Sequence, residues 1–288
     1  MTPVEIVRAS MTPMEPLPTG VAPSLVPLEG IRAVIFDIYG TLIISAAGDI
    51  SLVNESSSVL GMAEAVRMLG GAGSSEDVEV ALGCYQAEIQ RLQSEARCRG
   101  EEYPEVEIRE VWKSIVSRLN LSCAMIEKAA LAYECAVNPC GEMPGASEMI
   151  RRLKRESFSL GIISNAQFYT RAVLEATSGI DLSSNSFEAQ LSIFSYREGI
   201  AKPSLRLFEK ASLNAEKLGL RPGEVLYIGN DLVKDIEPAA ATGFRTALFA
   251  GDKRSFRTGA LSTEDACRKA DVVLTSMIQL VEVLGLRK

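Results

Sequence analysis

Two short apolar runs that lie far apart in the 288-residue chain each end in acidic residues, and this pair constrains the fold more than any other feature. Asp37 follows the run 33–36, and Asp231 and Asp235 follow the run 225–228. Continuous apolar runs of this length are typical of strands buried in a parallel sheet. Because ligands bind outside the carboxyl ends of parallel strands, the pattern predicts that three carboxylates meet at one edge of a sheet.

Further apolar runs alternate with segments of helical periodicity from residue 31 onward. We predict strands at 32–36, 158–163, 190–194, 224–228, 244–249 and 271–274. Helices are expected at 146–155, 168–176, 203–217, 233–241 and 275–286. This alternation predicts an α/β fold with a three-layer, Rossmann-like parallel sheet at its core.

A long helical segment interrupts this alternation. Residues 46–141 separate the first two predicted strands by far more than an ordinary crossover connection. Apolar positions in this segment recur at spacings of three and four, which predicts helices at 62–68, 77–97, 106–119 and 124–136. We therefore expect a helical cap, 46–141, inserted after the first strand of a core that comprises 31–45 and 142–288.

The cap holds the only tryptophan, Trp112, and five of the six cysteines. A lone tryptophan usually fills a core, so we expect Trp112 to lie inside the helix bundle; a platform for the substrate is the alternative. The cysteines form no CxxC pair, which favours a reduced, cytoplasmic protein over a disulfide scaffold.

The first 30 residues contain six of the twelve prolines, which predicts an extended and loosely ordered tail. Glu5, Arg8 and Glu15 interrupt the hydrophobic core that a signal peptide would need. The tail could also lie across the domain or dock a partner. No stretch of the chain approaches the roughly twenty apolar residues that cross a bilayer, so we expect no membrane partner.

Composition limits the chemistry that is open to the chain. Hydrophobic residues make up 47% and charged residues 23%, as in an ordinary globular enzyme. The net charge of −7 and the lack of a basic run argue against a nucleic-acid partner. The chain has no histidine, which excludes Ser-His and Cys-His nucleophile pairs and imidazole zinc sites. Catalysis must therefore depend on carboxylates, Lys, Tyr or a metal ion.

Four stretches carry a family resemblance. They are FDIYGTL at 36–42, IISNA at 162–166, GIAKPSLRLFEKA at 199–211 and YIGNDLVKDIEPA at 227–239. In their order and in their places after predicted strands, they resemble the motifs of the haloacid dehalogenase (HAD) superfamily. The resemblance covers residues 31–288, and the insertion point of the helical segment is similar to that of the family's type 1 cap.

The resemblance implies a covalent mechanism and a Mg²⁺ cofactor. Asp37 would be the nucleophile, forming an aspartyl intermediate that water then cleaves. Asp37, the backbone carbonyl of Tyr39 and Asp231 would hold the metal, which prefers a few hard oxygen ligands and several waters. Asp235 would orient a metal-bound water or a nearby lysine.

The resemblance also implies a binding site for the transferring phosphoryl group of a small-molecule substrate. Ser164 and Lys202 would bind this group, with Thr41 and Asn165 beside it. Lys202 would also neutralise the carboxylates. Taken singly, Ser164 could equally be a helix cap and Lys202 a solvated loop charge.

One position departs from the pattern of the family's phosphatases, which usually carry a second Asp two residues after the nucleophile. Tyr39 stands there, and a phenol with an unperturbed pKa of about 10 is a poor base at neutral pH. The metal-independent 2-haloacid dehalogenases resemble this chain at that position, and Arg67, Arg91 and Arg97 are candidates for their halide-binding arginine. In contrast, Gly-Asn-Asp at 229–231 resembles the metal-binding form of the fourth motif.

Weighing these features, we expect a Mg²⁺-dependent phosphatase that acts on a small phosphorylated metabolite. A 2-haloacid dehalogenase-like hydrolase and a catalytically silent HAD-fold binding protein are the alternatives. A homodimer is possible.

Overall fold

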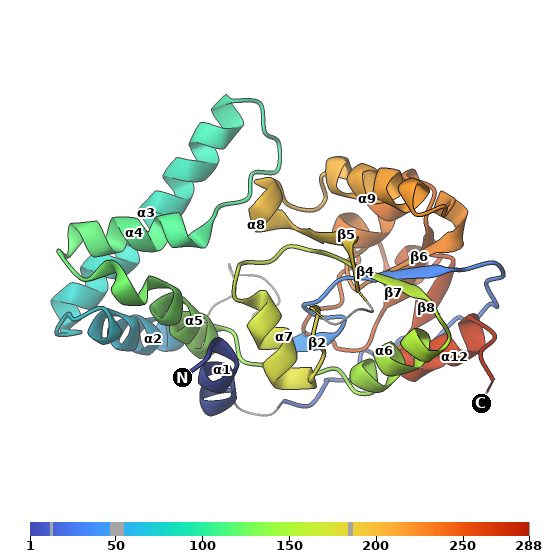
Figure 1. The fold of residues 1–288 in the computed structure, drawn as a ribbon, viewed down its shortest axis with the longest axis horizontal. Coiled ribbons are helices and arrows are strands. Elements are labelled where there is room, and N and C mark those ends of the chain that lie inside the picture. The colour runs from blue at the N-terminus through green and yellow to red at the C-terminus, as the bar shows by residue number, and fades with distance from the viewer. Residues whose placement is uncertain (12–13, 47–54, 184–186, 288) are drawn as a thin grey trace.

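The structure is a computed structural model that describes residues 1–11, 14–46, 55–183 and 187–287 (Figure 1). Its centre is a six-stranded sheet in which every neighbouring pair of strands is parallel. The strands in spatial order are β5 (Phe187–Phe194), β4 (Ser159–Ser164), β1 (Ala33–Phe36), β6 (Val225–Gly229), β7 (Arg245–Phe249) and β8 (Val272–Leu274). All six correspond to predicted strands, so the predicted parallel sheet is confirmed.

The register of the central strands aligns the candidate site. Phe36 at the end of β1 is level with Ile162 of β4 on one side and Ile228 of β6 on the other. Because the three strands run in the same direction, their carboxyl ends meet at one edge of the sheet. The residues that follow β1, β4 and β6 are therefore neighbours in space.

Helices cover both faces of the sheet and give the predicted three layers. Val34 and Phe36 of β1 belong to the hydrophobic cluster that contains α6 and α7, whereas Ala33 and Ile35 pack with α9. This alternation follows from the two-residue period of a strand. The helices concerned are α6 (Ala146–Arg155), α7 (Thr170–Ser178), α9 (Leu205–Lys217) and α10 (Glu237–Ala241).

Two predicted helices differ from the structure. The segment 233–241 begins with a π-helical turn, η4 (Leu232–Ile236), in which Ile236 N donates to the carbonyl five residues earlier, before α10 follows. The segment 275–286 forms only the 3₁₀ turn η5 (Met277–Gln279) and α12 (Leu280–Val283). Gly285, with a φ of 61°, stands just after this helix, where a left-handed residue commonly ends a helix.

Two short helices, α8 (Ser195–Glu198) and α11 (Thr263–Cys267), were not predicted. The structure also has two 3₁₀ turns: η2 (Cys123–Met125), at the start of the predicted helix 124–136, and η3 (Pro222–Glu224).

A bundle of four helices stands between β1 and β4 in the chain, as predicted. The helices are α2 (Glu55–Met68), α3 (Ser75–Cys98), α4 (Ile108–Arg118) and α5 (Ile126–Val137). Residues 47–54, at the start of the expected cap, lie outside the described residues. The bundle is flanked by a two-stranded antiparallel sheet of β2 (Ile43–Ser45) and β3 (Cys140–Glu142), which was not predicted.

Trp112 lies in the core of this bundle, as expected. It is fully buried, and its ring packs edge-on against Tyr85 and Tyr133 at centroid distances of 6.1 and 5.7 Å. Such aromatic pairs add to the stabilisation from burial itself.

The N-terminal segment differs from the expected loose, extended tail. It begins with α1 (Pro3–Ser10), where Thr2 and Glu5 form a capping box and Pro3 occupies the first turn, a position that tolerates proline. α1 packs against both α5 and α7, and Val7 is fully buried. Farther along, Ser24 pairs with Val273 of β8 at the edge of the sheet. The segment is thus part of the folded structure.

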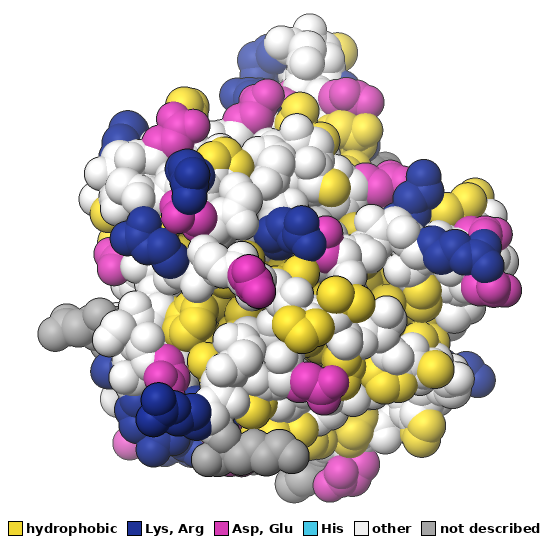
Figure 2. Space-filling model, turned by 90° about the vertical axis from the view of Figure 1, so that its right-hand side faces the viewer, with side chains coloured by type: hydrophobic (Ala, Val, Ile, Leu, Met, Phe, Trp, Pro, Cys, Tyr) yellow, Lys and Arg dark blue, Asp and Glu magenta, His cyan; other side chains and the backbone are white. Residues whose placement is uncertain are grey.

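On the face shown in Figure 2, basic and acidic side chains are interspersed among polar and apolar ones. All six cysteines are free thiols. In the described part of the chain, we find no helix with the length and apolar character needed to span a membrane.

Candidate active site

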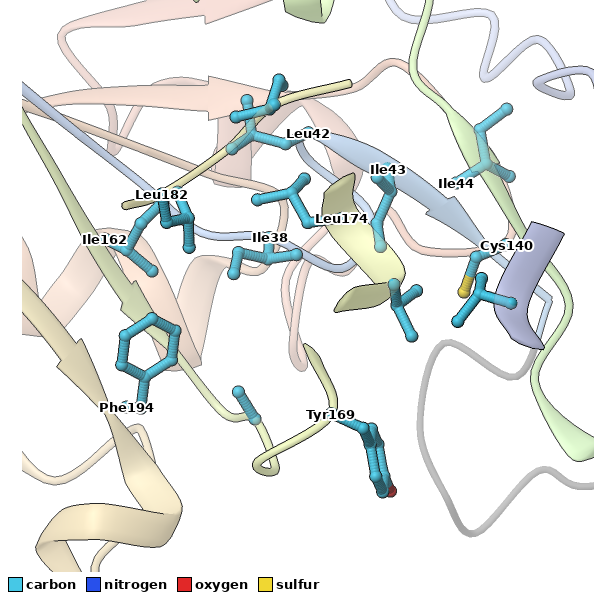
Figure 3. Close-up of a cluster of buried hydrophobic side chains, with 14 of the residues drawn as sticks. Ile38, Leu42, Ile43, Ile44, Cys140, Ile162, Tyr169, Leu174, Leu182 and Phe194 are labelled. Atoms are coloured by element: carbon cyan, nitrogen blue, oxygen red, sulfur yellow. The ribbon is translucent and has the colours of Figure 1, made fainter. Parts of the chain in front are cut away.

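Asp37 occupies the carboxyl end of the central strand. Its backbone N–H donates to the carbonyl of Ile228 at 2.9 Å, which extends the β1–β6 ladder by one residue. Residues after it turn away into the core: Figure 3 shows Ile38 and Leu42 beside Leu174 of α7. Gly40 makes this turn possible, with a φ of 82° and no room for a Cβ, which would lie 2.5 Å from Ser255 Cβ.

Lys202 joins the two acidic segments. Its Nζ lies 2.8 Å from Asp37 Oδ1 and 2.6 Å from Asp235 Oδ1. All three side chains are almost completely buried. The structure therefore brings together a predicted nucleophile, a predicted phosphoryl-binding lysine and a predicted acidic partner from three separate motifs.

Asn165 fixes the backbone of Lys202. Its Oδ1 accepts a hydrogen bond from Lys202 N at 2.7 Å, and its Nδ2 donates to the Lys202 carbonyl at 3.2 Å. The sequence suggested that Asn165 lies against the substrate; the side chain lines the cavity, but its amide is used to position the lysine.

A fourth buried residue, Tyr227 of β6, completes this cluster. Its hydroxyl lies 2.9 Å from Asp235 Oδ1, 3.0 Å from the Ile163 carbonyl and 3.4 Å from Lys202 Nζ. Lys202 Nζ thus donates to Asp235 and Tyr227, whereas its contact with Asp37 Oδ1 is an ion pair that lacks hydrogen-bond geometry. Tyr227 was not predicted as a site residue, because the run 225–228 predicts only a strand. The available signal was a phenol in an otherwise aliphatic run.

The charges of this cluster depend on one another. Burial raises the pKa of Asp37 to about 6, against the attraction of Lys202. Burial also disfavours the ammonium of Lys202, but attraction by Asp235 and Asp37 outweighs it, so the pKa of Lys202 lies above its usual range. The lysine therefore stays charged at neutral pH and holds the two carboxylates together.

The two downstream acids have different surroundings. Asp235 uses both oxygens: Oδ1 contacts Lys202 and Tyr227, and Oδ2 accepts from Asp231 N at 3.0 Å. Gly229 is required beside it, since a Cβ there would lie 2.4 Å from Asp235 Cγ. Asp231 caps η4 with Oδ1, which accepts from Val233 N and Lys234 N. Its Oδ2 accepts no hydrogen bond from the described residues.

The donor set fits a magnesium ion. Among the described residues, no three acidic or cysteine side chains are arranged to hold a metal. Mg²⁺ needs only one or two carboxylates with other oxygens and waters. Asp37, Tyr39 and Asp231 line one cavity, and the Tyr39 carbonyl accepts no hydrogen bond from any described group. Two carboxylates and a backbone carbonyl are thus available, whereas Asp235 is fully engaged.

The side chain of Tyr39 is no base. Its hydroxyl lies 3.1 Å from Thr170 Oγ1, and burial, together with the nearby Glu134, raises the pKa of Tyr39 well above its usual value. The phenol therefore stays protonated at neutral pH.

Two of the predicted substrate-binding residues are deeply buried. Thr41 is fully buried and donates to Asn230 Oδ1 at 3.0 Å, which ties the first motif to the fourth. It does not line the cavity. Ser164 is 1% exposed and does not line the cavity either; its hydroxyl donates to the Asn165 carbonyl at 3.5 Å, and its nearness to Asp37 lowers the pKa of that carboxyl. Ser164 thus lies next to the candidate nucleophile, whereas Thr41 supports the turn.

A cavity of about 1160 Å³ lies between this site and the helical bundle. Its core side includes Asp37, Lys202 and Asp231, and its bundle side includes residues of α3 and α5. Of the three candidate arginines, only Arg97 lines the cavity. The other two form ion pairs on their own helices, Arg67 with Glu64 and Arg91 with Glu88 and Glu95.

A parallel α/β sheet with a buried carboxylate–lysine cluster at the carboxyl end of its central strand defines an enzyme core. Comparison with known families gives the family: a model of haloacid dehalogenase-like hydrolases matches residues 31–243. The chain therefore belongs to the haloacid dehalogenase-like hydrolases.

Two curated relatives match part of the chain. A glyceraldehyde 3-phosphate phosphatase of Pyrococcus furiosus is 30% identical over 145 residues, which cover 50% of this chain and 54% of the relative. A putative uncharacterized hydrolase of Schizosaccharomyces pombe is 36% identical over 96 residues, which cover 32% of this chain and 40% of the relative. The chain thus spans about half the length of the curated relatives that it matches.

Solved structures support the fold. A HAD phosphatase from Thermococcus onnurineus superposes with a TM-score of 0.51 at 19% identity, covering 88% of this chain and 98% of that one. A 2-haloacid dehalogenase from Pseudomonas syringae pv. Tomato superposes with a TM-score of 0.52 at 17% identity, also covering 88% of this chain and 98% of that one. At these identities the likeness is one of fold alone, and it extends to both a phosphatase and a dehalogenase.

Proposed function

We propose that this hydrolase is a Mg²⁺-dependent phosphatase that acts on a small phosphorylated metabolite through an aspartyl-phosphate intermediate. The observation that carries the proposal is the set of free oxygens beside the nucleophile, namely the Tyr39 carbonyl and Asp231 Oδ2, in the cavity that Asp37 lines. The partial match to a glyceraldehyde 3-phosphate phosphatase supports the same reaction class.

In this proposal each group of the site has one task. A carboxylate oxygen of Asp37 attacks phosphorus, the P–O bond to the leaving group breaks, and the leaving oxygen takes up a proton. Water then attacks phosphorus of the acyl phosphate, which releases inorganic phosphate and restores Asp37. Lys202 and the Ser164 hydroxyl bind the phosphoryl oxygens. Asp37, Asp231 and the Tyr39 carbonyl would hold Mg²⁺, which would supply charge compensation for the phosphate.

Asp235, Tyr227 and Asn165 act through Lys202. They hold its ammonium and its backbone, so that the positive charge stands beside Asp37 before substrate arrives. Such preorganisation avoids reorganisation cost during the reaction. Residues 46–141 would act as the cap that closes the cavity over the substrate. A cytoplasmic location and a homodimer stay predictions from the sequence.

A dehalogenase is the second candidate, and two observations favour it. Tyr39 stands in place of the second Asp, and Arg97 lines the cavity, where it could receive a halide. Such an enzyme would need no metal, because its carbon centre is uncharged. It would release halide from a 2-haloacid in the presence of chelator.

Phosphate release from 4-nitrophenyl phosphate tests the proposal. We expect turnover with Mg²⁺, none with chelator, and a loss of at least about 100-fold in Asp231→Asn, a magnitude typical of lost transition-state charge stabilisation. Asp265→Asn, at an exposed position on α11, is the matched control. Full activity in Asp231→Asn would contradict the metal role.

A further inference from the structure

The helix α3 presents three glutamines to the cavity. Gln86, Gln90 and Gln93 are spaced by four and three residues, so they lie on one face of the helix. All three line the cavity that also holds Asp37. We call this set the glutamine face. It belongs to the helical bundle, across the cavity from the catalytic cluster.

The amides of the glutamine face are available to a ligand. None of the three makes a hydrogen bond with any residue that the structure describes. In contrast, the charged residues on another face of α3 pair with one another, with Arg91 between Glu88 and Glu95. Gln86 and Gln90 are exposed and Gln93 is half-buried, so the three amides are hydrated in the open cavity and can exchange that water for a ligand.

An apolar wall adjoins the glutamine face. Leu82, Tyr85 and Ile89 of the same helix line the cavity as well. The ring of Tyr85 is held in place by contacts with Trp112 and Tyr133. Hydrophobic side chains with a few polar groups among them are usual in small-molecule sites, where the polar groups fix orientation.

The chemistry of the amide selects the ligand. A carboxamide carries two N–H donors and an acceptor oxygen but no charge. A hydroxyl group is likewise a neutral donor and acceptor, so each amide can exchange two hydrogen bonds with it. A charged group on the ligand would find no opposite charge on the glutamine face. The cavity, at about 1160 Å³, exceeds the usual upper range for a small ligand of about 1,000 Å³, so it has room for a leaving group longer than three carbons.

We propose that the glutamine face binds the hydroxyl groups of an uncharged leaving group, so that the substrates are phosphate esters of sugars or polyols. This inference rests on the proposed phosphatase function and specifies its substrate class. The phosphoryl group would lie at Asp37 and Lys202, with the hydroxyl-bearing carbon skeleton along Tyr85 and the glutamine face.

Steady-state kinetics with three esters test the inference. Glucose 6-phosphate carries hydroxyls, 3-phosphoglycerate carries a carboxylate, and 4-nitrophenyl phosphate has neither. We expect the highest kcat/KM for glucose 6-phosphate. Gln90→Met should lower that value by about 2- to 10-fold, as for a lost hydrogen bond, and leave kcat/KM for 4-nitrophenyl phosphate within about 2-fold. Gln190→Met, on β5 and outside the cavity, should change neither.

Two outcomes of these assays would overturn the inference. The first is an equal effect of Gln90→Met on glucose 6-phosphate and on 4-nitrophenyl phosphate. The second is a preference for 3-phosphoglycerate, which would assign the recognition of the leaving group to Arg97 at the end of α3.

A binding measurement separates this inference from the proposed function. Trp112, the only tryptophan, contacts Tyr85 of the cavity wall, so its fluorescence can report binding without turnover. In an Asp37→Asn background, glucose 6-phosphate should bind more weakly after Gln90→Met than after Gln190→Met. That result would support the inference even if the parent protein released no phosphate, which would contradict the proposed function alone. Equal binding in both variants would overturn the inference.

Discussion

Lys202 Nζ lies 2.6 Å from Asp235 Oδ1 in a position where neither side chain is exposed by more than 3%. A buried ion pair of this kind adds little stability in itself, but loss of one partner leaves an uncompensated buried charge. The pair links the loop after β5 to the segment after β6. The pair also holds the Lys202 ammonium beside Asp37. Its main role is therefore to arrange the site.

Lys202→Met should therefore lower the free energy of unfolding, by an amount that depends on pH. The two carboxylates then face each other without a cation, and we expect a loss of about 3–5 kcal/mol of stability at pH 8. Burial already raises the pKa of Asp37, and loss of the attraction by Lys202 raises it further, so the folded variant binds more protons than the unfolded chain and its stability increases as pH falls.

Thermal unfolding of Lys202→Met at pH 5.5 and pH 8 checks this expectation. The difference in Tm between parent and variant should be smaller at pH 5.5. Lys210→Met, which removes a surface partner of Glu198, is the control and should change Tm little at either pH. A difference that is independent of pH would contradict the account.

Tyr227→Phe should affect turnover more than substrate binding. The variant keeps the ring packing on Phe208 but removes the hydroxyl that contacts Asp235 and Lys202. We expect kcat to fall by about 10-fold and KM to change by less than about 3-fold, because the lost interaction orients a group that acts in the transition state. Tyr169→Phe, which loses a buried hydrogen bond to Glu134, is the control for stability. Equal kcat values in the two variants would refute the positioning role.

Tyr39→Phe should leave the phosphatase rate within about 3-fold of the parent, since a phenol whose pKa is well above its usual value transfers no proton at neutral pH. Tyr39→Asp introduces a carboxylate at the same position and should speed the hydrolysis of the aspartyl phosphate. Rapid-quench kinetics of the two variants give both rates. A fall of more than about 10-fold in Tyr39→Phe would show that the phenol acts in the reaction.

Val7→Asp should destabilise the whole fold through α1. Val7 is fully buried where α1 packs against α5 and α7, so an aspartate there would be buried or would displace the helix. We expect a loss of about 2–4 kcal/mol, as for other polar groups forced into a core. Ala9→Asp places the same charge on the exposed side of α1. Urea unfolding should separate the two variants; equal midpoints would mean that α1 contributes no stability.

The sequence predicted the sheet well because each core strand is an apolar run bounded by turn residues. The runs 33–36 and 225–228 also placed Asp37, Asp231 and Asp235 correctly at one edge, since strand direction and register follow from the parallel fold. Lys202 stands a short loop beyond the predicted strand 190–194, but only the resemblance gave it a role at the site.

Other features depend on tertiary contacts that a pattern does not contain. β2 and β3 have three residues each, too few to show alternation. α1 was not predicted, because the prolines around it are typical of an extended segment. Its burial depends on contacts with α5 and α7. The hydroxyl of Tyr227 has a role only because Lys202 and Asp235, from two other segments, reach it.

The most direct test of the central claim is to trap the covalent intermediate. The protein would be mixed with 4-nitrophenyl phosphate and Mg²⁺, quenched in acid and digested, and the peptide that contains Asp37 would be analysed by mass spectrometry. We predict one phosphoryl group on Asp37, absent with chelator and absent in Asp37→Asn. Phosphate release without any adduct on Asp37, or an ester formed on Asp37 from 2-chloropropionate in chelator, would contradict the phosphatase account.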